Sequence, residues 1–269
     1  MAGHQLSAMP SLILHHYDFS PFAEKIRLAL GLRGLGWHSV VQPSVMPKPD
    51  LVALTGGYRH IPVLQIGADV YCDTRRISRE LDRRYPSSSP LDPRTRALAT
   101  AVEAWAERDL FWPAARYVSG VNAEVVDPQL HVDRALMRGK RPPSLDRVKR
   151  VSRTSLAQLR PQIAVVEAML SHGAAFLLSD RPTQVDLAVY HGLWFLSALQ
   201  INCASELEPY ALTRAWMSRL AEVGHGAAQP LSSLEALAIA ARFDPEPVEG
   251  SIEDDSLPSV GSCVSRKSP

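Results

Sequence analysis

The stretch LILHHYDFSPFAEKIRLAL, residues 12–30, decides the class of fold because it joins a strand directly to a helix. Residues 12–16 form an apolar run with the length of a buried strand. Ser20 and Pro21 then favour a helix start, since serine caps free helix amides and proline is tolerated at the first helical position. Apolar residues recur at helical spacing through Leu30. The sequence therefore predicts a strand followed by a helix.

The residues that follow continue this alternation of strand and helix patterns up to the proline at position 86. Short apolar runs bounded by turn residues predict strands, and a Gly-Ala-Asp turn between two of them predicts an antiparallel hairpin. The predicted elements are a strand over residues 37–41, a helical turn over 50–54, hairpin strands over 61–66 and 70–72, and a helix over 73–85. Their order, β-α-β-(α)-β-β-α, predicts an α/β domain over residues 11–86.

Beyond a linker at residues 87–93, strand patterns nearly vanish and long helical patterns predict an all-helical domain over 94–243. The predicted helices cover residues 94–119, 145–171, 185–199, 209–222 and 231–241. The connection over 120–143 is predicted to be irregular, and connections of that length are often functional. Residues 244–269 are rich in Pro, Ser, Gly and acidic residues, which predicts a disordered tail.

The composition argues against several classes of function. The 269 residues include 29 Lys+Arg and 28 Asp+Glu, so the net charge of +1 creates no overall field that would gather nucleic acid or an anionic membrane. The three cysteines form no CxxC pair, which disfavours a disulfide framework or a zinc site. No apolar stretch approaches the roughly 18 residues of a membrane span, and no leader is recognisable at the start. We expect a cytoplasmic protein without nucleic-acid or membrane partners.

Ser20 is the first candidate for chemistry. It lies between a strand and the amino end of a helix, where free amides and the helix dipole stabilise an anion. A hydroxyl group at this place can donate a hydrogen bond to a bound thiolate, or it can serve only as a helix cap. Tyr17 offers a second hydroxyl three residues earlier, either as the donor or as a wall of the site.

Two further motifs fit a peptide-like ligand. Ile61-Pro62 opens the predicted hairpin, and a cis proline there would leave the backbone of the preceding residue open to pair with an extended peptide. Asp73 could take an ammonium group of the ligand, while Thr74 and the amides of its helix could take a carboxylate. Each motif alone is also a common turn or cap.

Together these motifs resemble the cytosolic glutathione S-transferase family, in particular its serine-type bacterial and fungal members. The resemblance covers about residues 11–243 and implies a thioredoxin-like α/β domain followed by an all-α domain. In the helical half, the stretch TQVDLA resembles the capping box that opens a buried core helix of the family. The matching segments, in family order, are residues 20–27, 60–64, 73–74 and 183–188.

The resemblance implies that glutathione is the co-substrate and that no metal is required. Ser20 would hold the glutathione sulfur as a thiolate for attack on a small hydrophobic electrophile. Ile61, with Pro62, would pair with the cysteinyl unit, and Asp73 with Thr74 would anchor the γ-glutamyl end. A homodimer is also implied, in which the α/β domain of one subunit meets the helical domain of the other.

The sequence departs from the family before the hairpin, where many members carry Asn-Pro and this chain has residues 55–60, TGGYRH. Arg59 or His60 could reach the glycyl carboxylate from there. Serine in place of the cysteine of the omega-like and beta-like classes argues against thiol-transferase chemistry, since serine forms no mixed disulfide. Two alternatives stay open: a non-catalytic binding or interaction protein of the same fold, and a glutathione-dependent isomerase or etherase.

The helical half holds two features that could shape a substrate pocket. Residues 138–160 include eight basic residues and one acidic residue. This pattern favours a solvated helix face, with a surface for an anionic substrate or partner as the alternative. The first long helix carries side chains that could line a pocket or pack in the core or a dimer interface: Trp105, Phe111, Trp112, Arg116 and Tyr117.

Overall fold

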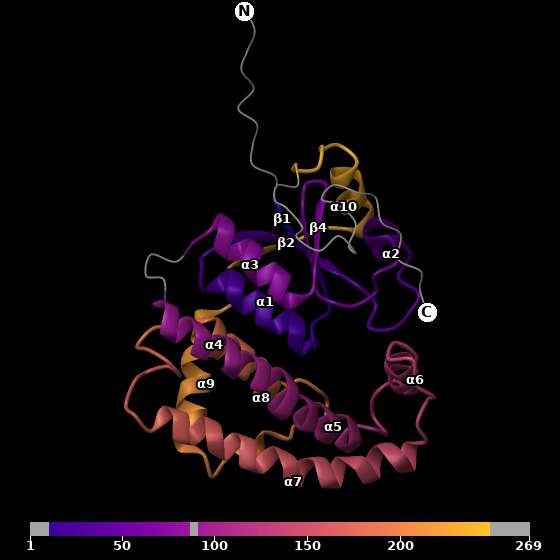
Figure 1. Ribbon diagram of the computed structural model, residues 1–269. Helices are drawn as coiled ribbons and strands as arrows, with labels where there is room; N and C mark the ends of the chain where they lie inside the picture. Colours follow the sequence, from indigo (N-terminus) through magenta and orange to yellow (C-terminus); the bar gives the residue numbers. More distant parts are fainter. Residues whose placement is uncertain (1–10, 87–90, 248–269) are drawn as a thin grey trace, which may run out of the picture.

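The computed structural model describes residues 11–86 and 91–247, and it consists of a sheet covered by helices above a layer of longer helices (Figure 1). Residues 87–90 of the predicted linker and residues 248–269 of the predicted tail lie outside the described residues. The elements of the first half are β1 (Leu12–His16), α1 (Pro21–Gly31), β2 (Gly36–Val41), α2 (Pro49–Thr55), β3 (Val63–Ile66), β4 (Asp69–Cys72) and α3 (Thr74–Arg84). This is the predicted order of strands and helices.

The sheet has the order β4-β3-β1-β2-β5, with β1 parallel to β2 and antiparallel to β3. Side chains of β1 alternate between the two faces, as in any strand. Leu12 and Leu14 join the large core beneath the sheet, which includes side chains of α1 and α3. Ile13 packs instead with Val40 and Ala236 on the other face. Both faces of the central strand are therefore buried.

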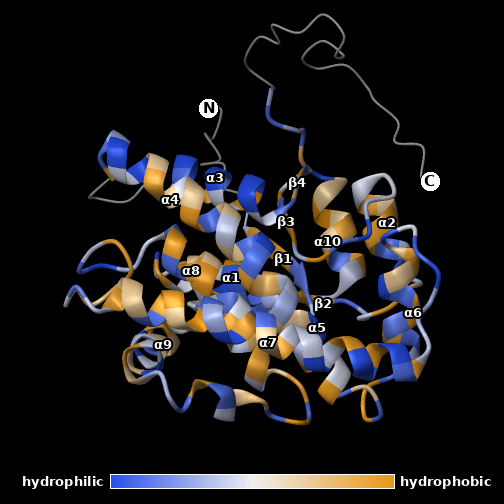
Figure 2. Cartoon of the chain, turned by 60° about the horizontal axis from the view of Figure 1, so that its bottom comes forward, coloured by the Kyte–Doolittle hydropathy of each residue, from blue (hydrophilic) through white to orange (hydrophobic). Residues whose placement is uncertain are grey.

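The fifth strand, β5 (Ala227–Pro230), is a feature that the sequence analysis did not predict. It pairs in parallel with β2, after a stretch in which the indole nitrogen of Trp37 donates to the carbonyl of His225 at 2.7 Å. The helix that follows, α10 (Ser233–Ala240), is largely hydrophobic and stands beside α2 (Figure 2). After the helical half, the chain thus returns to the first sheet and covers one of its faces.

The helical half consists of the elements between these two visits to the sheet. Its α-helices are α4 (Pro93–Trp105), α5 (Phe111–Val121), α6 (Pro128–Leu136), α7 (Leu145–Leu170), α8 (Gln184–Trp194) and α9 (Ala211–Val223). The helix predicted over residues 94–119 is interrupted by a π-helical turn over Ala106–Leu110. The connection predicted to be irregular contains α6, which begins at a capping Asp127 followed by a proline.

The predicted capping box at the start of α8 is confirmed, and it anchors the core of the helical half. The carboxylate of Asp186 is fully buried and accepts hydrogen bonds from the backbone and the hydroxyl of Thr183 at 2.8 and 2.9 Å. It also accepts from the amide of Leu177 and the indole of Trp216, both at 2.9 Å. One carboxylate thereby joins α8 to α9 and to the loop that precedes α8.

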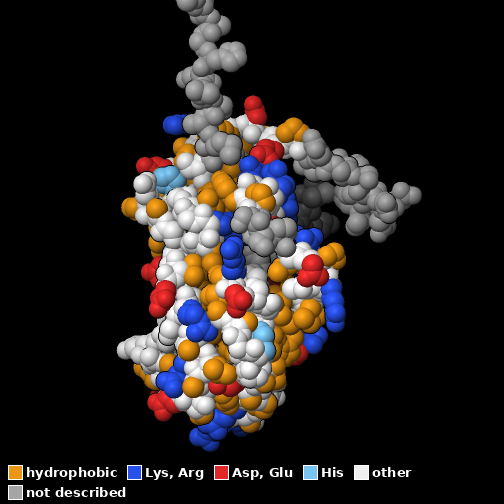
Figure 3. All heavy atoms as spheres, turned by 90° about the vertical axis from the view of Figure 1, so that its left-hand side faces the viewer, with side chains coloured by type: hydrophobic (Ala, Val, Ile, Leu, Met, Phe, Trp, Pro, Cys, Tyr) orange, Lys and Arg blue, Asp and Glu red, His pale blue; other side chains and the backbone are white. Residues whose placement is uncertain are grey.

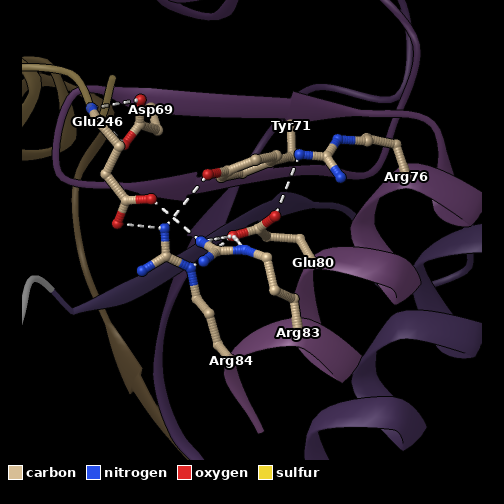
Figure 4. A network of polar contacts seen from close by, with 7 residues as sticks. All are labelled: Asp69, Tyr71, Arg76, Glu80, Arg83, Arg84 and Glu246. Carbon is tan, nitrogen blue, oxygen red and sulfur yellow. Dashed lines mark hydrogen bonds and ion pairs between the residues drawn. The ribbon is translucent and has the colours of Figure 1, made fainter. Parts of the chain in front are cut away.

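The end of the described chain is held against α3 and β4 by ion pairs (Figure 4). Glu80 accepts hydrogen bonds from Arg83 at 2.6 Å and Arg84 at 2.7 Å. The carboxylate of Glu246 pairs with the same two arginines at 3.0 and 2.6 Å, and its amide donates to Asp69 at 3.2 Å. The first residues of the predicted tail therefore contact the sheet domain.

The close approach of β5 predicts that Gly226 tolerates no side chain. Gly226 has φ of 71°, and an added Cβ would overlap with the carbonyl oxygen of Leu35. Gly34 has a similar φ of 60° but open space around it. Gly34→Ala should therefore lose only the roughly 1–2 kcal/mol of left-handed strain, and Gly226→Ala roughly 1–3 kcal/mol more. Urea unfolding of both variants measures the difference, and equal losses would show that β5 shifts without cost.

The second prediction concerns Glu80, whose side chain is 1 % exposed. Burial raises the pKa of its carboxyl, but the hydrogen bonds from Arg83 and Arg84 outweigh burial and lower the pKa from 4.5 to about 2. A lowered folded-state pKa contributes stability above the unfolded pKa, and this stability is lost as pH falls through the folded pKa. Glu80→Gln should therefore be less stable than wild type at pH 7, with a difference that shrinks between about pH 4.5 and 2.

Thermal midpoints measured across pH test this expectation. The matched control is Glu222→Gln on α9, because Glu222 is exposed and should leave the pH dependence of stability unchanged. A destabilisation by Glu80→Gln that stays constant from pH 7 to pH 2 would show that the arginine contacts do not hold the carboxylate in its charged form.

Candidate functional site

Ser20 lies at the N-terminus of α1, where the turn after β1 ends. Its backbone amide donates to the carbonyl of Tyr17 at 3.1 Å, and its hydroxyl oxygen accepts from the amide of Ala23 at 3.2 Å. The predicted helix cap is therefore present. Because this bond occupies a lone pair of the oxygen, the hydroxyl hydrogen is still able to donate to a ligand. Ser20 is buried in the wall of a cleft.

The cleft has a volume of about 660 Å³ and lies between the sheet domain and the helical half. The start of α1 and the loop before β3 form one wall, and residues of α5, α6 and the start of α7 form the other. Six aromatic side chains contribute an apolar surface: Tyr17, Phe19, Phe22, Phe111, Trp112 and Phe195. The position and size suit a small organic molecule next to Ser20.

The motif before the hairpin reaches the same cleft. The Ile61-Pro62 peptide bond is cis, which confirms the expectation for this proline. His60 and Ile61 line the cleft together with Ser20, whereas Pro62 does not. The structure thus brings three of the predicted site residues to one cavity.

Asp73 and Thr74 lie at the start of α3 and are not part of the cleft lining. Asp73 caps the helix, because its carboxylate accepts from the amide of Arg75 at 2.8 Å. It has φ of 72° and is the one residue other than glycine with a positive φ in residues 11–86 and 91–247. Non-glycine residues in such conformations are often found at functional sites. Thr74 is buried as the first residue of the helix.

Three cations from the two walls of the cleft lie around one carboxylate of α6: Lys48 and Arg59 of the sheet domain and Arg134 of α6 itself. Asp133 forms ion pairs with Arg59 and Arg134 and accepts from the amide of Met46 at 3.2 Å. Burial raises the pKa of Asp133, but the amide and Arg59 outweigh it, so the pKa is lowered and the group stays ionised. Lys48 is 3 % exposed, and burial together with Arg134 lowers its pKa to about 8.

Arg134 also connects α6 to the hydroxyl candidate Tyr17. Its guanidinium donates to the Tyr17 hydroxyl at 3.0 Å and to the carbonyl of Ser44 at 2.9 Å. The sequence analysis named neither Lys48 nor Arg134. A lysine between two prolines is an ordinary loop residue in sequence, and Arg134 belongs to a helix that was not predicted. The Asp127-Pro128 cap signal could have revealed that helix.

The basic segment 138–160 divides between the two predicted roles. Arg138, Lys140 and Arg147 line the outer part of the cleft, whereas Lys149 pairs with Glu124 outside it. Of the side chains proposed on the first long helix, Phe111, Trp112 and Arg116 line the cleft. The other two bond elsewhere: Trp105 donates to Gln162 and Tyr117 to Glu206.

A sheet with a cis-proline beside a capped helix start, joined to an all-helical half, defines the thioredoxin-like class of two-domain proteins. The family model of the glutathione S-transferase N-terminal domain matches residues 14–89, and that of the C-terminal domain matches residues 127–223. A solved GST-like protein from Pseudomonas syringae is 37% identical, with 92% of this chain and 80% of that chain covered and a TM-score of 0.70. The chain belongs to the glutathione S-transferase family.

Other solved structures share the fold at lower identity. A glutathione S-transferase from Rhodospirillum rubrum F11 is 21% identical over 78% of this chain and 87% of its own, with a TM-score of 0.56. The β-etherase LigF from Sphingobium sp. strain SYK-6 is 16% identical over 79% and 98%, with a TM-score of 0.57. A search of the curated proteins gives no match.

Two features of the described residues bear on partners and cofactors. No helix in residues 11–86 or 91–247 has the length and hydrophobicity that crossing a membrane requires. Within the same residues, His, Cys, Asp and Glu side chains form no group of three that could hold a metal ion. Members of the family bind glutathione and typically form dimers.

Proposed function

We propose that this protein is a serine-type glutathione transferase that activates the thiol of glutathione for attack on an electrophile. The observation that carries the proposal is the position of Ser20, a capping serine with an available hydroxyl hydrogen in the wall of an aromatic cleft. The amides at the start of α1, the helix dipole and this hydroxyl would together stabilise a thiolate at the same point. The sulfur would then face the aromatic side of the cleft.

In the proposed complex, glutathione binds along the edge of the sheet domain. Its cysteinyl unit pairs with the backbone of Ile61, and its γ-glutamyl end binds to Asp73 and Thr74 at the start of α3. His60 lines the cleft beside Ile61 and is proposed to bind the glycyl carboxylate with Arg59. Lys48, a buried cation in the same wall, is also proposed to bind the glycyl carboxylate. The domain proposed to bind glutathione comprises residues 11–86, and the proposed helical domain covers residues 94–243, except that β5 and α10 within that range pack on the sheet.

The reaction proposed is nucleophilic substitution or addition by the thiolate. The thiol proton leaves to solvent, a carbon–sulfur bond forms at the electrophilic carbon, and in a substitution the leaving group departs with its electron pair. We also propose a cytoplasmic homodimer. Turnover with an electrophile would separate this function from a non-catalytic binding protein of the same fold, and product analysis would separate it from an isomerase or etherase.

The first test of the proposed function is Ser20→Ala. Loss of the hydroxyl should abolish the ultraviolet thiolate band of the glutathione complex and lower kcat by roughly 10²–10³-fold, because the donor acts on the developing charge. Glutathione affinity, measured by calorimetry, should change little, since the peptide is bound elsewhere. Ser20→Thr retains a hydroxyl and a helix cap and serves as the matched control. A thiolate band that persists in Ser20→Ala but disappears in Tyr17→Phe would assign the role to Tyr17.

The second test concerns the proposed γ-glutamyl anchor. Asp73→Asn keeps an oxygen that can accept from the amide of Arg75 but removes the negative charge, so α3 stays capped. Glutathione affinity should fall by about tenfold or more, as expected for loss of a charge-assisted hydrogen bond. Asp92→Asn, at the capping residue of α4, is the matched control and should bind as wild type does. Equal affinity of Asp73→Asn and wild type would remove this anchor.

A further inference from the structure

We propose that the electrophile is an aromatic carboxylate, bound with its ring against Trp112 and its carboxylate between Arg116 and Arg138. The reaction part of this inference rests on the proposed function, whereas the binding part does not. The inference replaces the general expectation of a small hydrophobic electrophile with a specific class, an aromatic ring that carries a negative charge. The ring would meet the apolar floor of the cleft, and the charge would meet the rim.

The charges that line the cleft are all of one sign. None of its lining residues, all of which belong to the described part of the chain, is Asp or Glu. The lining includes seven Lys and Arg side chains: Lys48, Arg59, Arg116, Arg134, Arg138, Lys140 and Arg147. A cleft lined by one sign of charge concentrates counter-ions, because its low-dielectric walls focus the field. A negatively charged small molecule is therefore the ligand that this lining favours.

The inner and outer cations differ in their partners. Arg59 and Arg134 share the carboxylate of Asp133, which neutralises part of the inner charge. At the rim, Arg116, Arg138, Lys140 and Arg147 form no ion pair with any carboxylate of residues 11–86 and 91–247. The rim is thus the part of the cleft where the anion of a ligand would find uncompensated positive charge.

This charge is local to the cleft. The whole chain carries a net charge of only +1, and the face in Figure 3 shows acidic and basic side chains interspersed with hydrophobic ones. Partial burial lowers the pKa of Arg138, and the like charges of the neighbouring Arg134 and Arg116 lower it further because they disfavour another positive charge. A bound carboxylate would relieve this repulsion.

The aromatic side chains lead from Ser20 to this rim. Phe22, two residues after Ser20, contacts Phe111 with ring centroids 4.7 Å apart, and Phe111 contacts Trp112 at 5.2 Å. The guanidinium of Arg138 lies over the Trp112 ring, 5.4 Å from its centroid. An aromatic ring placed on this surface would direct its reactive carbon toward Ser20 and its carboxylate toward Arg138.

Binding of two matched, unreactive probes tests the inference with the full chain. Calorimetric titration should show that 3,5-dinitrobenzoate binds wild type roughly tenfold more tightly than the neutral 3,5-dinitrobenzamide. Arg138→Gln and Arg116→Gln should each remove most of this preference while leaving the affinity for the amide unchanged. Arg153→Gln, an exposed arginine of α7 that does not line the cleft, is the matched control and should behave as wild type.

A second titration, in saturating S-methylglutathione, locates the anion. If the benzoate binds at the rim, it should bind at the same time as S-methylglutathione. If the benzoate binds to Lys48 and Arg59, S-methylglutathione should displace it, and this result would overturn the proposal. Equal affinity of wild type for the two probes, or an equal loss of both in Arg138→Gln, also overturns it. Failure of S-methylglutathione to bind would instead refute the proposed function, and the first titration would still decide the rim site.

Turnover supplies the reaction readout. In 4-chloro-3,5-dinitrobenzoate the thiolate would form a bond to the carbon that bears chlorine, and chloride would leave with the bonding electron pair. Its kcat/KM, divided by the uncatalysed rate with glutathione, should exceed that of the corresponding benzamide about tenfold in wild type and in Arg153→Gln. The advantage should disappear in Arg138→Gln and shrink with added salt. An advantage unchanged in Arg138→Gln would contradict the assigned site.

Discussion

The burial of α1 between the sheet and the helical half is the constraint on which the rest of the structure depends. Nearly every residue of this helix is buried, including three charged ones, and a buried charge is stable only with a partner. Lys25 pairs at 3.0 Å with Glu107 of the π-helical turn, which binds the two halves together. Glu24 pairs with Arg27 and, at 3.0 Å, with His225 just before β5. The helix that presents Ser20 to the cleft is thus fixed from both sides.

The elements that could be predicted from the sequence are those with local signals. Three signals are each made of a few neighbouring residues: the apolar run of β1, the Ser-Pro start of α1 and the capping box of α8. All three are present in the structure. β5 has no such signal, because its residues, Ala-Ala-Gln-Pro, are exposed and show no apolar alternation. It forms because Gly226 permits a close approach to Leu35 and because Trp37 bonds to the chain just before it. These contacts join segments nearly 190 residues apart.

The same distinction applies to the site. Ser20 and Ile61 belong to motifs that can be recognised in a few residues, and the structure brings both to the cleft. The cationic lining depends on the convergence of residues from separate elements, so its single sign is not visible in sequence. Lys48 is unremarkable until the fold buries it, and Arg138 was one of eight basic residues with no means of telling which face the cleft. Whether Asp73 and Thr74 contact the ligand stays a prediction, since the cavity at Ser20 does not extend to them.

Helix α6 shows how structural and functional charges are divided in this cleft. The carboxylate of Asp133 interacts with Arg59, with the amide of Met46 and with the neighbouring Arg134, and the contacts to Arg59 and Met46 attach α6 to the sheet domain. Arg59 and Arg134 therefore already have a structural partner. The carboxylate of an electrophile placed beside them would compete with Asp133 and with the glycyl carboxylate that is proposed to bind there. The cations of the cleft beyond the end of α6, such as Arg138, form no such ion pair with a carboxylate of the described residues. A substrate charge is consequently better met at the rim than beside Ser20, which leaves the deep part of the cleft to the thiolate and to the carbon that it attacks.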